Sequence, residues 1–349
     1  MNPYENLPEK AFWRSAVANK SMFDIGGLWA PKFHIDQTTK TSTFGSCFAQ
    51  HFGRALRERG FNWLDAEPAP REFKPSSAER FNFGLFSART GNIYTTSLLL
   101  QWVEWALGVK TPPTEVWEKD GRFFDPFRPN IEPNGFESKE ELLRSRDETI
   151  RALNHVIRRS ELFVFTLGLT ESWSNATGGY EYPICPGTIA GEFDENEHKF
   201  CAQDFETVNR NLTQVIEVIH RANGNLKFLL TVSPVPLTAT NSGDHVVVAT
   251  SASKAILRAA TETARNKFEY VDYFPSFEII NSPVFKGTFF QPNQRQVHEA
   301  GVSFVMGNFF DALESAKSDD APTAPETSTQ DVVCEEELLA AFGQREAEK

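Results

Sequence analysis

The sequence predicts an α/β fold of three layers, in which a mainly parallel sheet lies between two sets of helices. Short β-branched and apolar runs alternate along the chain with segments whose apolar residues recur at helical spacing, a pattern typical of parallel strands joined by crossover helices. The run 161–167 is apolar almost throughout, as expected of a strand buried on both faces. Functional groups should then gather where the strands end, at the carboxyl edge of the sheet.

The individual elements follow from local patterns. Strands are predicted at residues 40–44, 61–65, 161–167, 225–232 and 270–272, and helices at 48–59, 97–107, 138–159, 204–222, 251–267 and 298–313. The longest helix opens with the capping box Ser138-Lys-Glu-Glu141. A small hairpin is expected around Asp120-Gly121. Residues 66–77, 175–202 and 274–290 are predicted to be inserted loops.

The domain organisation is predicted from shifts in composition. Residues 1–39 form an N-terminal extension packed on the core, with a short helix at 7–18 and an edge strand at 33–35. Residues 40–314 form the main domain. From residue 315 to 349 the chain is rich in Ser, Asp, Ala, Pro, Thr and Glu, which predicts a disordered acidic tail.

Composition limits the classes of function. The chain of 349 residues is 40% hydrophobic and holds 31 Phe, enough for a large core. Its net charge is −12 and no basic stripe stands out, so we expect no nucleic-acid partner. The four cysteines show no disulfide framework, and no apolar run reaches the length of a signal or a membrane span. We therefore expect a soluble cytoplasmic protein without a membrane partner.

The stretch with the clearest chemistry is Gly45-Ser46, where the first strand turns into a helix. Glycine permits a sharp turn there, and the free N–H groups of a helix N-terminus favour an anion. Ser46 is thus a candidate nucleophile whose oxyanion would form beside those N–H groups. Serine is also a common helix N-cap, and this alternative stays open.

Residues Gly45-Ser-Cys-Phe-Ala49 spell the motif that names the GSCFA family, and the chain resembles that family over about residues 40–310. Further family-like blocks stand at 165–173, 230–237, 245 with 253–254, and 273–278. The family is similar to the SGNH-type hydrolases, whose SGNH/flavodoxin-like fold places a nucleophilic serine after the first strand in a Gly-Asp-Ser motif. Here the middle position is absent. The resemblance implies Ser46 as nucleophile, with oxyanion donors at the backbone of Cys47 and Gly84 and at Thr170, which replaces an asparagine.

The resemblance leaves the general base open between two histidines. His298 heads the last helix, where SGNH-like proteins carry an Asp-x-x-His motif, but Arg295 stands in the place of the aspartate. His245 matches a histidine of the GSCFA pattern, and we favour it. The group that orients the base is not identified; the candidates are Glu171, Asp244 and Glu278.

Other reactive residues have competing interpretations. Arg128 either binds an anionic substrate group or forms an ion pair. Cys47 is a thiol nucleophile or, as we favour, packs inward and contributes its N–H. Cys185, His198 and Cys201 match no standard zinc spacing, so we expect no metal and no cofactor.

Two functions remain in competition. The first is an SGNH-like serine acyl esterase or O-acyltransferase that acts on a small-molecule or saccharide ester. The second is a ligand-binding protein on the same fold with a degraded active site, motivated by the missing aspartate before Ser46 and by Arg295 before His298. The oligomeric state is not predicted.

Overall fold

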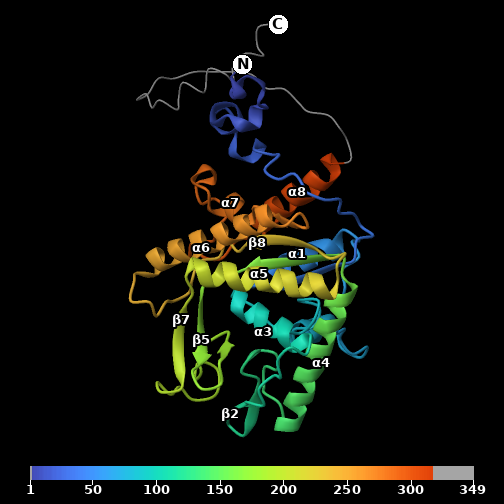
Figure 1. Cartoon of the computed structure of the whole chain (residues 1–349), viewed down its shortest axis with the longest axis vertical. Helices are drawn as coiled ribbons and strands as arrows, with labels where there is room; N and C mark the ends of the chain where they lie inside the picture. Colours follow the sequence, from blue (N-terminus) through green and yellow to red (C-terminus); the bar gives the residue numbers. More distant parts are fainter. Residues whose placement is uncertain (1, 317–349) are drawn as a thin grey trace.

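A four-stranded parallel sheet forms the centre of the protein (Figure 1). The computed structural model describes residues 2–316. The strands stand in the order β1 (Thr41–Gly45), β4 (Leu162–Leu167), β8 (Lys227–Val232) and β9 (Val271–Tyr273), and each pair is parallel. The predicted α/β fold class is confirmed.

Helices cover both faces of this sheet and complete the three layers (Figure 1). One face packs against α3 (Thr96–Ala106), α4 (Lys139–Arg159), α5 (Phe205–Ala222) and α6 (Val246–Lys267). The other face packs against α1 (Ala49–Glu58), α7 (Ser276–Asn281) and α8 (Glu299–Ser315). Along β4, Phe163 and Phe165 belong to the first core and Leu162 and Val164 to the second. This alternation explains why the strand is apolar at nearly every position.

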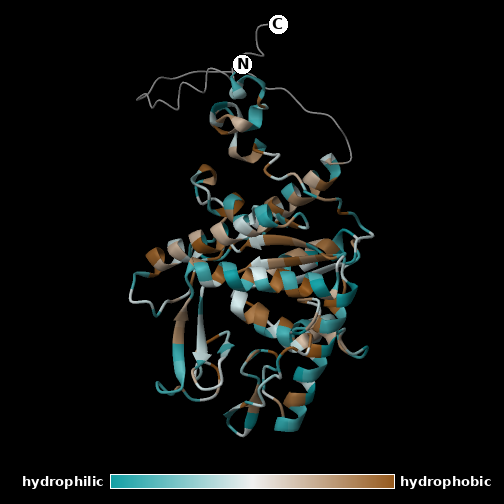
Figure 2. Ribbon diagram, in the orientation of Figure 1, coloured by the Kyte–Doolittle hydropathy of each residue, from teal (hydrophilic) through white to brown (hydrophobic). Residues whose placement is uncertain are grey.

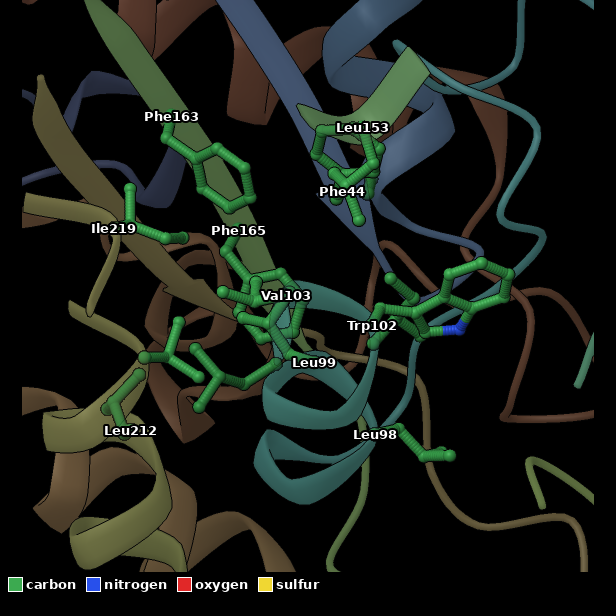
Figure 3. Packing of buried hydrophobic residues seen from close by; sticks show 14 of the residues in the cluster. Phe44, Leu98, Leu99, Trp102, Val103, Leu153, Phe163, Phe165, Leu212 and Ile219 are labelled. Carbon is green, nitrogen blue, oxygen red and sulfur yellow. The ribbon is translucent and has the colours of Figure 1, made fainter. Parts of the chain in front are cut away.

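The first core is built on aromatic contacts between neighbouring strands. Phe44 on β1 stacks on Phe163 of β4, with ring centroids 5.2 Å apart, and α3 lies against these strands with Leu99 and Val103 (Figure 3). Burying one such ring contributes roughly 1.5–3 kcal/mol. Figure 2 shows that the central strands are hydrophobic, whereas hydrophilic and hydrophobic bands alternate along α4. The strands that carry the site are therefore firmly held.

Several predicted elements are confirmed in detail. Ser138 Oγ accepts the N–H of Glu141 at 3.1 Å and caps α4. The hairpin around Gly121 is β2 (Trp117–Lys119) and β3 (Arg122–Phe124). The helix α6 begins at Val246, five residues before its predicted start, because the His245 side chain caps its N-terminus.

Several predicted elements differ from the structure, among them the loop predicted at 274–290, which contains the helix α7. Residues 61–65 form only a parallel bridge at Trp63, because the chain pairs with β1 at Thr41 alone before the turn-rich segment that holds the short helix α2 (Pro75–Arg80). The helix predicted at 7–18 is two short turns, Glu9–Ala11 and Arg14–Ala18, because Phe12 between them is extended (φ −112°, ψ 127°). No strand forms at 33–35.

The inserted segment after β4 is a second sheet, although residues 175–202 were predicted to be a loop. Its strands β5 (Glu171–Asn175), β6 (Tyr180–Tyr182) and β7 (His198–Ala202) are antiparallel in the order β6-β5-β7. Gly178 and Gly179 make the turn of the first hairpin, and Gly179 has a positive φ of 66°. The backbone N–H of Gln203 donates to Thr170 O at 2.8 Å and closes the neck of the insertion.

The N-terminal extension contacts the second core. The Trp29 indole N–H donates to Asp272 Oδ2 at 3.1 Å, and its ring stacks on Phe309 of α8. The acidic tail predicted at 315–349 lies outside the described residues beyond position 316. Within residues 2–316, no helix has the length and apolar character needed to cross a membrane.

Candidate functional site

Three strands end at one cavity. Ser46 follows β1, Gly168 follows β4 and Ser233 follows β8, and all three line a cavity of about 470 Å³ at the carboxyl edge of the sheet. This is where a parallel α/β sheet is expected to bind ligands. The sequence-predicted residues Cys47 and Glu171 line the same cavity.

The turn after β1 requires glycine. Gly45 has a φ of 133°, and a Cβ there would collide with the backbone of Thr166 on β4. The close approach lets the N–H of Ser46 donate to Thr166 O at 3.1 Å. Gly45 thus fixes Ser46 against the neighbouring strand at the edge of the sheet.

The Ser46 hydroxyl is buried without a partner. The residue is 2% exposed, and its Oγ has no hydrogen bond among residues 2–316. The N-cap position of α1 is Phe48, and no side chain caps that helix. The alternative interpretation of Ser46 as a helix cap is therefore wrong, and its hydroxyl is left available for other chemistry.

Cys47 places an exposed thiol in the cavity beside Ser46, so the prediction that its side chain packs inward is wrong. Desolvation by the cavity walls raises the pKa of this thiol, against the smaller lowering effects of Arg295, Lys254 and the nearby N–H groups of Phe48 and Cys47. The group is therefore a neutral thiol at physiological pH. The backbone N–H of Cys47 has no backbone acceptor among the described residues.

Tyr94 is a site residue that sequence reasoning missed. Its carbonyl accepts the N–H groups of Gly168 (3.0 Å) and Leu169 (2.9 Å), and Ile93 beside it donates to Gly45 O at 2.8 Å. Burial and the neighbouring Cys47 raise the pKa of the Tyr94 phenol to about 12. Segment 91–94, rather than the predicted Gly84, therefore runs beside the serine. Its only sequence signal was the turn at Gly91-Asn92.

Arg295 also lines the cavity. Its buried Nε has no hydrogen-bond partner, and the guanidinium forms no ion pair within the described part of the chain. Arg295 is close enough to Cys47, Tyr94 and Lys254 to act on their charged forms. Arg295 thus brings an unneutralised positive charge to the site.

The remaining walls are mostly apolar. The insertion and the loop after β8 supply eight apolar side chains: Trp173, Pro183, Ile184, Phe200, Val235, Pro236, Leu237 and Ala239. The two walls are joined where Thr240 Oγ1 donates to Glu171 Oε1 at 2.7 Å. The predicted carboxylate of Glu171 is therefore engaged across the cavity mouth rather than with a histidine.

Neither predicted histidine lines the cavity. His245 is exposed, and its Nδ1 accepts the N–H of Val247 at the start of α6. His298 uses both ring nitrogens: Nε2–H donates to Thr288 O at 2.7 Å, and Nδ1 accepts the N–H of Gly301. In this arrangement both histidines act as helix caps.

Other predicted residues lie apart from the cavity lining. Thr170 is buried, and its N–H donates to Ser253 Oγ at 3.2 Å. Gly84 occupies a turn with a φ of 68°, and Asp244 is exposed. Glu278 accepts hydrogen bonds from Arg258 and Tyr273 beside a different cavity.

Arg128 is fully enclosed rather than presented to the cavity at Ser46. Its Nε donates to Asp125 Oδ2 at 2.7 Å, and its other nitrogens donate to Arg89 O, Thr149 and Ser145. The Arg128 guanidinium therefore binds groups of the protein itself, as in the ion-pair alternative.

Lys254 lies directly beneath the site. It is 3% exposed, and its Nζ donates to Gly168 O at 2.7 Å.

Among residues 2–316 no cluster of three or more His, Cys, Asp or Glu side chains has the arrangement needed to hold a metal ion.

The fold and the cavity define an α/β protein with an unpartnered serine at the carboxyl edge of its parallel sheet. The chain belongs to the GSCFA family, whose sequence model matches residues 40–309. No curated protein and no solved structure matches the chain. Membership in this family does not specify a reaction or a substrate.

Proposed function

We propose that the protein is a serine-dependent acyl esterase or O-acyltransferase in which Ser46 attacks the carbonyl carbon of an ester. The observation that carries the proposal is the Ser46 hydroxyl itself, which lies at the cavity without a hydrogen-bond partner among the described residues. A serine with no capping role at the carboxyl edge of a parallel sheet is well placed for nucleophilic attack.

The backbone beside Ser46 supports stabilisation of the tetrahedral intermediate. The N–H of Cys47 has no backbone acceptor, and the N–H groups of Cys47 and Phe48 both approach the Cys47 sulfur. As Ser46 Oγ bonds to the carbonyl carbon, the negative charge that develops on the carbonyl oxygen of the substrate would meet these donors at the start of α1, whose dipole also favours a negative charge. The backbone of Gly84 and the Thr170 hydroxyl, which the family resemblance implied, are not needed for this arrangement.

The cavity walls favour a substrate with an apolar or ring-shaped part. Trp173 and Phe200 from the insertion line one side, and prolines and aliphatic residues line the other. Such surfaces hold an acyl chain or stack on a sugar ring. A small-molecule or saccharide ester is the proposed substrate class, with water or a hydroxyl group as acyl acceptor.

A fluorophosphonate probe tests the proposal directly, since it reacts with activated serines. We expect mass mapping to find the label on Ser46, and Ser46→Ala to abolish both labelling and cleavage of aryl esters while the fold persists. Ser233→Ala is the matched control, because Ser233 lines the same cavity but its Oγ already accepts the N–H of Val235. Ester cleavage that survives in Ser46→Ala would reject the proposal.

The competing proposal is a ligand-binding protein on the same fold. It is favoured by the capping roles of His245 and His298, which leave the cavity without a histidine base. A folded protein that takes no label, and that is stabilised by an ester recovered chemically unchanged, would support binding without turnover.

A further inference from the structure

Lys254 is buried in a way that lysines seldom are. The residue is 3% exposed, and no carboxylate pairs with it among the described residues. Its one hydrogen bond is from Nζ to a backbone carbonyl, Gly168 O. An ammonium group without a counter-ion is costly to bury, so such a lysine tends to become a neutral amine.

Gly168 links this lysine to the nucleophile. It accepts the hydrogen bond from Lys254, and a Cβ built on it would lie 2.9 Å from Cβ of Ser46. The preceding helix residue, Ser253, holds the same segment by accepting the N–H of Thr170. The α6 helix therefore fixes Lys254 to the backbone segment that touches Ser46.

Burial favours the neutral form of Lys254, while the groups around it act in both directions. Burial lowers the pKa of Lys254 to about 7; a negative charge on Cys47 acts to raise this pKa, and Arg295 has a smaller effect that lowers it. Arg295 comes from the loop before α8 and Cys47 from the turn before α1; since Cys47 is a neutral thiol near pH 7, Arg295 is the charged one of these two groups. Close to neutral pH, a large fraction of Lys254 therefore carries a free lone pair.

We propose that Lys254 is the general base that activates Ser46. This inference rests on the proposed function and supplies the proton acceptor that the two histidines do not provide. The serine and the amine are not hydrogen-bonded in the unliganded protein, as Ser46 Oγ has no partner. Catalytic hydrogen bonds commonly tighten only when substrate fills the site.

The proton balance of the reaction is complete with Lys254 alone. As Ser46 Oγ bonds to the carbonyl carbon, its proton passes to the lone pair of Lys254 Nζ. The resulting ammonium protonates the departing alkoxide when the ester C–O bond breaks. In the second half, water or an acceptor hydroxyl gives its proton to Lys254 as it attacks the acyl-serine, and the ammonium returns that proton to Ser46 Oγ.

The test is the pH dependence of Ser46 labelling by a fluorophosphonate. We expect the rate to rise tenfold per pH unit up to about pH 7 and then to level off. Lys254→Met should lower the plateau by about 10²- to 10⁴-fold and remove the rise. Lys254→Arg should be equally slow, because arginine does not lose its proton. Lys267→Met, on the exposed end of the same helix, is the matched control.

Two outcomes would overturn the proposal. One is wild-type labelling in Lys254→Met, and the other is a loss of the pH-dependent rise in His245→Ala or His298→Ala instead. Nuclear magnetic resonance of ¹³C-lysine-labelled protein gives a second readout that needs no activity. A Lys254 signal that stays charged up to pH 9 rejects the base role even if Ser46 reacts. A Lys254 that titrates near pH 7 in a protein that takes no label instead locates the failure in the proposed function.

Discussion

Gly168 and Ser46 are in direct contact across the carboxyl ends of β4 and β1. A Cβ on Gly168 would lie 2.9 Å from Cβ of Ser46 and 3.2 Å from the carbonyl oxygen of Tyr94. These distances are shorter than ordinary van der Waals contacts, and one of the atoms belongs to the backbone. The position of Ser46 is therefore defined partly by the absence of a side chain on Gly168, at the end of the adjacent strand.

Gly168→Ala should displace Ser46 without unfolding the protein. We expect the rate of fluorophosphonate labelling to fall at least tenfold, because small errors in the position of a reacting atom are costly. Gly307→Ala in α8 is the control, since no atom outside its own helix backbone lies within 4 Å of the added methyl. Labelling of Gly168→Ala at the wild-type rate would show that the contact does not position the serine.

Arg295→Gln should remove a preference for negatively charged substrates. The guanidinium lines the cavity without an anionic partner in the described part of the chain, and a charge-assisted hydrogen bond contributes about 1.5–3 kcal/mol. We expect kcat/KM for a carboxylate-bearing aryl ester to fall about 10- to 100-fold. The neutral ester of the same phenol should change less than threefold. Equal losses for both esters would assign Arg295 to the oxyanion instead of to a substrate anion.

The Cys47 thiol should be slow to alkylate at neutral pH. Desolvation raises its pKa, so the reactive thiolate is scarce at pH 7 although the side chain is exposed to the cavity. We expect iodoacetamide to modify Cys47 about tenfold faster for each pH unit up to pH 9, measured by peptide mapping. A fast reaction that is already maximal at pH 7 would reveal a thiolate and support Cys47 as a nucleophile.

Asp125→Asn should destabilise the fold strongly. Burial alone would raise the Asp125 pKa, but Arg146 and Arg128, at 2.9 and 2.7 Å, outweigh it and hold the pKa below its usual value of 3.8. Removing the carboxylate leaves two buried guanidinium groups without a counter-ion, at a cost of about 3–5 kcal/mol. Denaturant unfolding measures this loss, with Asp311→Asn on the exposed side of α8 as control.

The same carboxylate gives a pH signature. Because the folded-state pKa of Asp125 is depressed, its contribution to stability is fully present above about pH 4 and is lost as the pH falls through the lower folded value. The unfolding free energies of wild type and Asp125→Asn should therefore converge in acid. A difference that does not depend on pH below 4 would contradict the ion-pair account.

The sequence predicted the elements whose signals are local. A β-branched run predicted β1, a glycine predicted the turn at Gly45-Ser46, and apolar residues at helical spacing predicted α1. The four-residue capping box Ser138-Lys-Glu-Glu141 predicted that Ser138 caps α4. The insertion was predicted as a loop because its short strands pair only with one another, and such pairing depends on tertiary context.

Two residues beside a recognisable turn in the sequence, Ser46 and Cys47, were predicted for the site, and both line the cavity. Tyr94, Arg295 and Lys254 come from three separate segments, and only the folded sheet edge brings them to the cavity or its floor. The histidines were favoured because their residue type suits a base. Their ring nitrogens are used by the N-terminal amides of α6 and α8, a local competition that residue type alone does not reveal.

The closed neck between Thr170 and Gln203 has a consequence for how this protein can change. The two ends of the insertion meet at one 2.8 Å hydrogen bond, while the insertion carries Trp173 and Phe200 into the cavity. Ser46 and Lys254 both lie outside that segment. Under the proposed function, the residues that would contact substrate and those that would react lie in separate stretches of chain, so residues 171–202 can be exchanged as a unit. A chimaera with a different segment in their place should accept different esters and keep the same attack.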